Sequence, residues 1–458
     1  MLAELAEGVR AGRVDPRDLV ASAFERIERH DADLNAVIAL RDRDEAIAEA
    51  ASVDRAAPLA GLPLLVKDNE HLAGFRTTYG SLLCRNRPPE EHDGYIPGKL
   101  RAAGAIPVGK TNVPEFTFDG FTDNPLFGPT RNPWNRDRSP GGSSGGSGAA
   151  LAAGMVPLAT GTDGGGSIRI PAAFCGLAGL KPTHGVVARV PIPAWIDLST
   201  YGPLAVTVPD VRLLLGLMAG PAPGDPTALP VPPPAFEGVL PARAFATPRL
   251  MDAGPLAPSV AARFDRALAS VEADLGIPVE PLEPGAIFAA IGDPYADWFV
   301  TCAFEHLHML GRETVVANLE RFGPSFRRTM QDALRIAPAT YMAARRRRFD
   351  YAGALDRLLG GDAVLLSPTM PIEGWAPDGR LPGGRYPHGA EGYNTDPLNL
   401  TGHPALSVPA GVNDDGVPFG LQIAGPRFAD HLVLNLGEAW ERANPWPHAA
   451  PGYEPFGG

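Results

Sequence analysis

The sequence predicts an α/β fold, because helical and extended segments alternate along it. Between Ser147 and Phe174, small apolar residues that suit a tightly packed helix are followed by a strand and then by a turn into a short helix. Such alternation favours an α/β core. The chain has 458 residues, of which 45% are hydrophobic, so it can bury a large core. No run of about eighteen or more apolar residues occurs, and we expect no contact with a membrane.

The N-terminal part opens with helix signals. Asp15 supplies a cap, Pro16 a preset first turn, and Asp18 an acid within that turn. Apolar residues recur from Leu19 to Ile27 at helical spacing, which predicts a helix with one buried face. The pattern then predicts strands at 36–40 and 105–108, an extended segment at 58–66, and helices at 44–51 and 97–103.

The later segments predict the rest of the core. We expect a helix at 147–154, a strand at 155–160, a turn entering a helix at 167–174, a mostly helical stretch at 261–358, and strands at 363–366, 405–408 and 420–424. Proline and glycine are dense from 220 to 234, which marks a boundary or a linker. We therefore expect one domain in four parts: an N-terminal helical region (1–60), a core with the sequence motifs (61–220), a proline-rich linker with a mostly helical insertion (221–360), and the C-terminal part of the core (361–458).

Charge and cysteine content exclude several classes of protein. The net charge of −12 disfavours nucleic-acid binding. The run Arg345 to Arg348 is the one basic cluster, and we expect it on a solvated helix face. Three cysteines, odd in number and far apart, argue against a disulfide framework, and we do not expect the first residues to be a signal peptide. We therefore expect a cytoplasmic protein.

Lysine is scarce, and each lysine is informative. The four lysines are Lys67, Lys99, Lys110 and Lys181. We expect Lys99 and Lys110 on the surface, whereas Lys67 follows the apolar run 62–66 and should be buried at a strand end. A buried lysine can lose its proton and act as a base, which arginine cannot. Lowering its pKa by about three units needs about 4 kcal/mol, which burial can supply.

Two glycine-serine blocks follow this lysine. They are Ser139-Pro140-Gly141-Gly142-Ser143-Ser144-Gly145-Gly146-Ser147-Gly148 and Gly161-Thr162-Asp163-Gly164-Gly165-Gly166-Ser167-Ile168-Arg169. Three glycine amides before Ser167, at the start of a short helix, suit an oxyanion. The alternatives are a flexible linker for the first block and a plain glycine turn for the second.

Other chemistries find no support in the sequence. None of the ten histidines lies in either block, and no Cys/His cluster has zinc-site spacing. The glycines are followed neither by Lys-Ser nor by Lys-Thr, and no dinucleotide-binding turn occurs. We expect no metal and no cofactor.

Several ordered motifs together resemble the amidase signature family. They are Val66-Lys67-Asp68-Asn69, Gly142-Ser143-Ser144-Gly145-Gly146, Gly161-Thr162-Asp163 through Gly165-Gly166-Ser167-Ile168-Arg169, Gly179-Leu180-Lys181-Pro182-Thr183, Tyr201-Gly202-Pro203-Leu204, Asn399-Leu400-Thr401-Gly402-His403-Pro404-Ala405 and Gly420-Leu421-Gln422-Ile423. The resemblance extends from the N-terminal helix to Asp430. It implies a large mixed β-sheet flanked by helices, with a helical insertion.

The resemblance also implies a catalytic group. The family's Ser-cisSer-Lys triad falls on Ser167, Ser143 and Lys67, with Ser143 held by a cis peptide bond. The amides of Gly164, Gly165, Gly166 and Ser167 would form the oxyanion hole. Ser144, Thr162, Asp163 and Arg169 would support the site, with ordinary capping as the alternative. Gly164 departs from the family, which often has a bulkier residue there, and Lys181 should be structural.

Aromatic residues around these motifs suggest a substrate pocket. Phe118, Phe121, Trp195 and Tyr393 could line an apolar acyl or aryl pocket. Core packing is the equal alternative for each. No charged residue is clearly placed to bind a substrate carboxylate.

The resulting hypothesis is a hydrolase that cleaves an amide-like C–N bond through an acyl-Ser167 intermediate. The expected substrate is a small-molecule amide, aryl amide or carbamate (urethane), with ester cleavage as a side activity, and the enzyme should be a monomer or homodimer. One alternative is the glutaminase subunit of a tRNA-dependent amidotransferase, although the region after Gly185 lacks the Ser-Ser-Leu-Asp-Gln stretch expected there. The other is a non-catalytic binding module.

Overall fold

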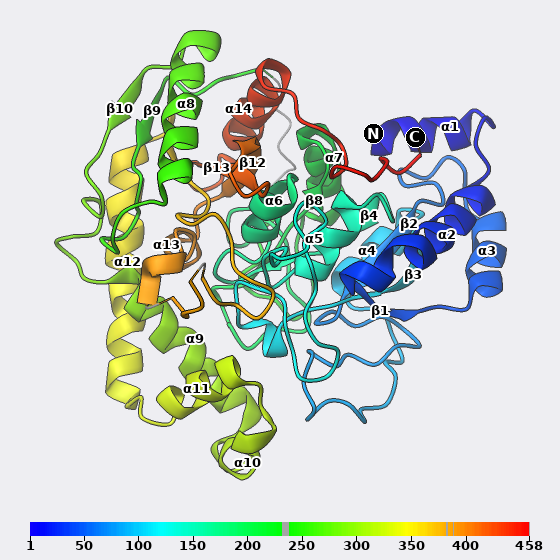
Figure 1. Ribbon diagram of the computed structural model, residues 1–458, viewed down its shortest axis with the longest axis horizontal. Helices are drawn as coiled ribbons and strands as arrows, with labels where there is room; N and C mark the ends of the chain where they lie inside the picture. The colour runs from blue at the N-terminus through cyan, green and yellow to red at the C-terminus, as the bar shows by residue number, and fades with distance from the viewer. Residues whose placement is uncertain (231–237, 382, 388, 458) are drawn as a thin grey trace.

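One large mixed sheet organises the protein. The computed structural model describes residues 1–230, 238–381, 383–387 and 389–457. Within them the main sheet has eleven strands in the order β1-β3-β2-β4-β8-β6-β12-β13-β11-β9-β10, and a small sheet pairs β5 with β7 (Figure 1). The strands are β1 (Val37–Leu40), β2 (Pro63–Lys67), β3 (Ile106–Thr111), β4 (Leu158–Ala159), β5 (Thr162–Asp163), β6 (Ala178–Lys181), β7 (Thr200–Tyr201), β8 (Leu204–Ala205), β9 (Arg243–Ala246), β10 (Val279–Pro281), β11 (Ala363–Pro368), β12 (Ala405–Val412) and β13 (Pro418–Ala424).

Helices surround this sheet. They are α1 (Leu2–Arg10), α2 (Pro16–Leu34), α3 (Arg43–Ala51), α4 (Tyr95–Ala102), α5 (Gly145–Ala152), α6 (Arg169–Cys175), α7 (Val208–Met218), α8 (Pro258–Leu275), α9 (Pro294–Leu310), α10 (Arg312–Asn318), α11 (Pro324–Ala333), α12 (Pro338–Leu359), α13 (Pro397–Thr401) and α14 (Asp430–Ala443). Short 3₁₀ turns lie at Glu115–Thr117, Leu319–Arg321 and Gly389–Gly392.

The sheet joins the two halves of the chain. Strand β6 from the N-terminal half pairs antiparallel with β12 from the C-terminal half. Helices α6 and α14 cover opposite faces at this seam. Gly420 of β13 lies against Ala173 of α6, whereas Gly437 of α14 lies against Leu406 of β12. The β12–β13 register and the two-residue period of a strand place Leu406 and Gly420 on different faces.

Most expected elements are present, with adjusted ends. The Asp15 side chain accepts a hydrogen bond from the amide of Arg17, and helix α2 begins at Pro16 as predicted. The strand expected at 155–160 is reduced to β4 (Leu158–Ala159). The described part of the segment 221–360 is not only helical, because β9 and β10 extend the main sheet at its edge. Such short edge strands carry little periodic signal. Residues 231–237 of the proline-rich linker lie outside the described residues.

One expectation about charged residues was wrong, and a second was wrong for part of the run from Arg345 to Arg348. Lys110 on β3 is fully buried, because its ammonium pairs with the carboxylate of Asp68 at 2.8 Å. In the basic run, Arg345 and Arg348 both pair with Asp197 on the loop before β7, so these two do not form a solvated face. Spacing along one helix cannot reveal a partner that another segment supplies.

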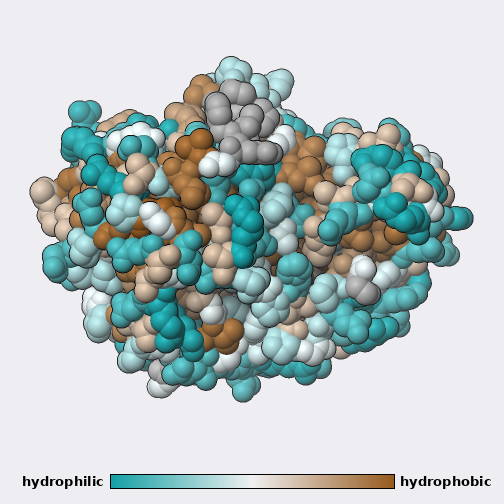
Figure 2. All heavy atoms as spheres, turned by 90° about the horizontal axis from the view of Figure 1, so that it is seen from above, coloured by the Kyte–Doolittle hydropathy of each residue, from teal (hydrophilic) through white to brown (hydrophobic). Residues whose placement is uncertain are grey.

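The surface is mixed in character. The face in Figure 2 shows hydrophilic residues interspersed with separate hydrophobic areas. Among the described residues, no helix is both long and apolar enough to cross a membrane. The first and last segments lie together, since the Arg26 guanidinium of α2 donates to the carbonyl of Glu454 at 2.9 Å.

Candidate active site

Lys67 ends β2 inside the protein, where it contacts both glycine-serine blocks. Its side chain is fully buried. The ammonium nitrogen Nζ lies 2.8 Å from the hydroxyl of Ser143 and 2.8 Å from the hydroxyl of Thr162. The Lys67 amide donates to the hydroxyl of Thr160 at 2.9 Å, which fixes the strand end. The structure thus brings together one lysine and hydroxyls that lie 76 and 95 residues later in the chain.

Burial lowers the pKa of Lys67 to about 7, although the negative charges of Glu70 and Asp163 oppose this change. The neighbouring carboxylate of Asp68 does not hold the proton on Lys67, because it pairs with Lys110. Burial also raises the pKa of Glu70 to about 7, which weakens its opposing charge. A fully buried lysine near neutral pH is therefore available in its uncharged form.

The first block is a packed turn and not a linker. The Gly142–Ser143 peptide bond is cis, and α5 begins two residues later at Gly145. A methyl group added at Gly146 would come within 2.4 Å of the amide nitrogen of Asn112. Added at Gly145, it would come within 2.2 Å of the Thr122 hydroxyl. Both glycines are needed because neighbouring segments approach them closely.

The second block is held by a buried ion pair. The Asp163 carboxylate pairs with the Arg169 guanidinium at 2.9 Å, and both side chains are fully buried. Burial by itself would raise the pKa of Asp163, but the charge of Arg169 outweighs it and holds this pKa well below its usual range. Arg169 also donates to Gln422 and Asn399, which ties the turn before α6 to the C-terminal half.

The turn presents fewer free amides than expected. The amide of Gly166 donates to Asp163 at 2.7 Å, so the prediction of three free glycine amides is wrong for Gly166. Among the described residues no partner is found for the amides of Gly164, Gly165 and Ser167. The Gly164 carbonyl accepts a hydrogen bond from the Trp298 indole at 2.7 Å.

Trp195 explains why glycine stands at position 164. A methyl group there would lie 2.1 Å from the Trp195 ring, closer than any side chain can approach. The indole nitrogen of Trp195 donates to the ring of His306 at 2.8 Å. Burial lowers the pKa of His306 to about 4, so that ring is neutral and can accept. The Trp195 indole therefore occupies the space that a side chain at position 164 would need.

A narrow pocket of about 90 Å³ opens onto the two serines. Ser143, Ser167 and Thr162 are among the residues that line it. Its remaining lining residues are mainly apolar or aromatic, and no Asp, Glu, Lys or Arg is among them: Asn69, Tyr79, Phe116, Thr117, Gly164, Pro191, Ile192, Pro193, Ala194, Trp195, Ser199, Tyr201, His306 and Met309.

The four predicted pocket residues occupy different places. Trp195 lines the pocket with Ser167. Phe118 packs against Trp195, with ring centroids 5.5 Å apart, but it is not among the residues that line the pocket. Phe121 instead lines a separate pocket and packs on Trp375. Tyr393 packs on the same Trp375 and on Tyr295. Their spacing in the sequence does not show which ring faces the serines.

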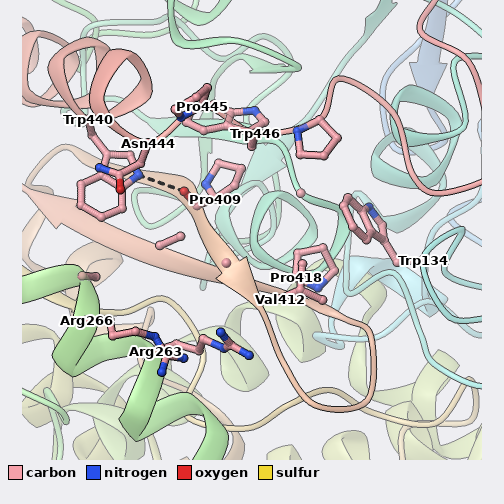
Figure 3. A pocket seen from close by; sticks show the side chains of 15 residues that line it. Trp134, Arg263, Arg266, Pro409, Val412, Pro418, Trp440, Asn444, Pro445 and Trp446 are labelled. Carbon is pink, nitrogen blue, oxygen red and sulfur yellow. Dashed lines mark hydrogen bonds between the residues drawn. The ribbon is translucent and has the colours of Figure 1, made fainter. Parts of the chain in front are cut away.

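A separate pocket of about 370 Å³ lies between α8, β12 and α14 (Figure 3). Trp134, Trp440 and Trp446 line it, and two arginines of α8, Arg263 and Arg266, approach it from the opposite side. None of Lys67, Ser143 and Ser167 reaches it. It is therefore distinct from the pocket described above.

The comparisons with known proteins agree with this fold and these motifs. The family profile described as Amidase matches residues 18–434. The chain belongs to the amidase family. It is an amidase-family enzyme that acts on C–N bonds. It is 37% identical to a glutamyl-tRNA(Gln) amidotransferase subunit from Thermus thermophilus, over 97% of each chain.

Solved structures of other amidase-family enzymes share the whole architecture. A bacterial aryl acylamidase of the amidase signature family is 30% identical, with a TM-score of 0.86 over 97% of this chain and 96% of that chain. The 6-aminohexanoate cyclic dimer hydrolase is 29% identical, with a TM-score of 0.86 over 98% of each chain. A structure from a study of a vestigial protein complex and the origin of an s-triazine catabolic enzyme is 33% identical, with a TM-score of 0.86 over 97% of this chain and 98% of that chain.

Sequence reasoning missed two residues that shape this site. Trp298 on α9 lies in the segment expected to be an insertion, yet its indole bonds the turn before Ser167. Thr395 precedes the Asn399 motif, and its hydroxyl donates to the Gly165 carbonyl at 2.5 Å. Neither residue has a local signal, because each acts on a turn more than 130 residues away.

Proposed function

We propose that this amidase-family enzyme hydrolyses an amide-like C–N bond through a covalent acyl-Ser167 intermediate. The observation that carries the proposal is the 2.8 Å contact between the Lys67 amine and the Ser143 hydroxyl, in a site where burial brings the pKa of Lys67 to about 7. A base with a pKa near the working pH is the most effective proton acceptor. Ser167 lines the same pocket as Ser143.

The reaction proceeds in two halves. In the first, the Ser167 oxygen bonds to the substrate carbonyl carbon while its proton passes through Ser143 to neutral Lys67. The negative charge on the carbonyl oxygen is stabilised by amides of the turn, for which Gly164, Gly165 and Ser167 are candidates. The proton returns through Ser143 to the leaving nitrogen as the C–N bond breaks. In the second half, water attacks the acyl-enzyme by the same proton route and releases the acid.

The pocket favours a compact apolar group next to the scissile bond. Aromatic and aliphatic side chains form most of its wall, which suits an aryl amide, an acyl amide or a carbamate. Esters would react by the same steps, because an ester carbonyl is less stabilised by resonance than an amide carbonyl and an alkoxide leaves more readily than an amide anion.

The names of the relatives raise a second candidate, the glutaminase subunit of a tRNA-dependent amidotransferase. Glutamine carries a carboxylate at neutral pH, and a buried carboxylate needs a cation or several donors. No lysine or arginine is among the described residues that line the pocket. The absence of the Ser-Ser-Leu-Asp-Gln stretch after Gly185 also argues against this candidate.

Labelling with a fluorophosphonate tests the proposal. The probe should phosphonylate Ser167, and peptide mapping should place the adduct there and not on Ser143 or Ser144. Turnover of p-nitroanilides and aryl carbamates should disappear in Ser167→Ala. An adduct on another residue, or hydrolysis of glutamine that needs an added partner protein, would contradict the proposal.

A further inference from the structure

A buried carboxyl group without a partner lies beside the turn that precedes Ser167. Asp396, the residue before α13, is 1% exposed. Neither of its carboxyl oxygens has a hydrogen-bond partner among the described residues. A buried polar group that lacks a partner costs free energy, so each such group in a native protein requires an explanation.

The position of this carboxyl relative to the turn is well defined. A methyl group added at Gly165 would lie 3.0 Å from the Oδ1 of Asp396 and 2.5 Å from the Trp298 ring. The carboxyl therefore lies against the α-carbon of Gly165, only two residues before Ser167. The hydroxyl of the preceding residue, Thr395, bonds the Gly165 carbonyl and keeps the two segments together.

Within the described residues, no cation forms an ion pair with Asp396. Burial raises its pKa to about 8, and the charges of Arg169 and Arg249 reduce this rise only in part. Arg169 bonds instead to Asp163, Asn399, Gln422 and a backbone carbonyl. Arg249 donates to backbone carbonyls of residues 253, 390 and 391. The carboxyl can therefore accept a donor that a bound molecule brings.

A row of three aromatic side chains, Trp298, Tyr295 and Tyr393, lies near the Asp396 carboxyl. The Trp298 ring, which touches Gly165, lies 5.8 Å from the Tyr295 ring, and Tyr295 stacks on Tyr393 at 6.0 Å. Burial raises the pKa of both tyrosines, and the negative charge of Asp396 raises these pKa values further. A carboxyl group next to aromatic faces is the environment that protein sites use to hold an ammonium group.

We propose that Asp396 is a specificity-determining residue that binds an ammonium group on the acyl part of the substrate, a few carbons from the scissile carbonyl. This rests on the proposed acyl-Ser167 chemistry. The acyl chain would lie beside the turn that holds Gly165, and its ammonium group would provide the partner that the Asp396 carboxyl lacks. An aminoacyl amide without a carboxylate is thus the preferred substrate class. A simple alkanoyl chain of the same length would leave the carboxyl unpaired.

Matched pairs of p-nitroanilides test this inference. The aminoacyl series glycyl, β-alanyl, 4-aminobutyryl and 6-aminohexanoyl is compared with acetyl, propionyl, butyryl and hexanoyl. We expect one aminoacyl length to exceed its uncharged partner in kcat/KM by about 10-fold or more, the usual size of a charge-assisted contact. In Asp396→Asn that ratio should fall to near one. In Asp396→Glu, whose carboxyl reaches one carbon further, the preferred acyl chain should become one carbon shorter.

Asp119→Asn is the matched control. Asp119 also acts on Tyr295 and Tyr393, but its carboxyl already accepts a hydrogen bond from Ser325 at 2.6 Å. This variant should keep the preference for the aminoacyl chain. Equal rates for both series in the wild type, or a preference lost in Asp119→Asn but kept in Asp396→Asn, would overturn the inference. Because uncharged anilides report acyl-Ser167 turnover independently, the inference can fail while the proposed function stands.

Discussion

The charge state of Lys67 offers the sharpest test of the proposed chemistry. Burial lowers its pKa from 10.5 to about 7, a difference that corresponds to about 5 kcal/mol. At pH 7 roughly half of the molecules then have a neutral amine, compared with about one in 3,000 for an ordinary lysine. Activity should therefore rise as the pH increases through about 7 and level off above it, since the neutral amine is the form that accepts the proton.

Two substitutions separate the base from a simple hydrogen-bond donor. Lys67→Arg keeps a cation that can donate to Ser143 but cannot lose its proton. We expect Lys67→Arg and Lys67→Ala to lose about 10²- to 10⁴-fold in kcat, the usual contribution of a general base. The measurement is kcat and kcat/KM for an aryl anilide from pH 5.5 to 9.5, with thermal unfolding as a check that each variant folds.

Lys181→Met is the matched control. Lys181 is also fully buried, and burial lowers its pKa to about 7, but its ammonium donates to the carbonyl of Pro182 and not to either serine. The control should keep the rise in activity near pH 7. A wild-type profile that is flat from pH 5.5 to 9.5, or an active Lys67→Arg, would refute a lysine base. If Lys181→Met alone lost the rise in activity near pH 7, the titrating base would be Lys181 and not Lys67.

Further predictions concern the turn before Ser167. Gly165→Ala should abolish turnover, because its methyl group would lie 2.5 Å from the Trp298 ring. Gly216→Ala in α7 is the control, because a methyl group there would meet no described atom within 4 Å. This control should keep full activity, and its free energy of unfolding in a denaturant titration should rise by up to about 1 kcal/mol. Trp298→Phe removes the indole that donates to the Gly164 carbonyl, and it should raise the activation free energy by about 1–3 kcal/mol. This effect should be seen as a lower kcat with a smaller change in KM. An unchanged kcat would show that this hydrogen bond does not hold the turn. Asp163→Asn breaks a fully buried ion pair and should lower the free energy of unfolding by about 3–5 kcal/mol, and a loss below about 1 kcal/mol in urea unfolding would argue against this ion pair as the support of the turn.

Local sequence was a good guide where a single segment carries the signal. The N-cap at Asp15 and the strand that ends at Lys67 follow from neighbouring residues, and both are present. The small residues after Ser143 predicted a packed helix, and α5 is wholly buried. Partners from distant segments could not be predicted. The spacing of residues does not indicate that Asp68 forms an ion pair with Lys110, or that Asp197 forms ion pairs with two arginines of α12.

The sequence by itself determined the α/β class, the family motifs and the residue types that the proposed chemistry needs, because those depend on hydrophobic periodicity and on short runs of glycine, serine and lysine. Only the tertiary structure decided which amides of the turn stay free, which ring fills the space beside Gly164, and that an unpaired carboxyl lies against Gly165. Those features arise where β5, α6, α9 and the segment before α13 meet. Burial and hydrogen bonding there depend on atoms brought together from more than 200 positions apart, which no local pattern encodes.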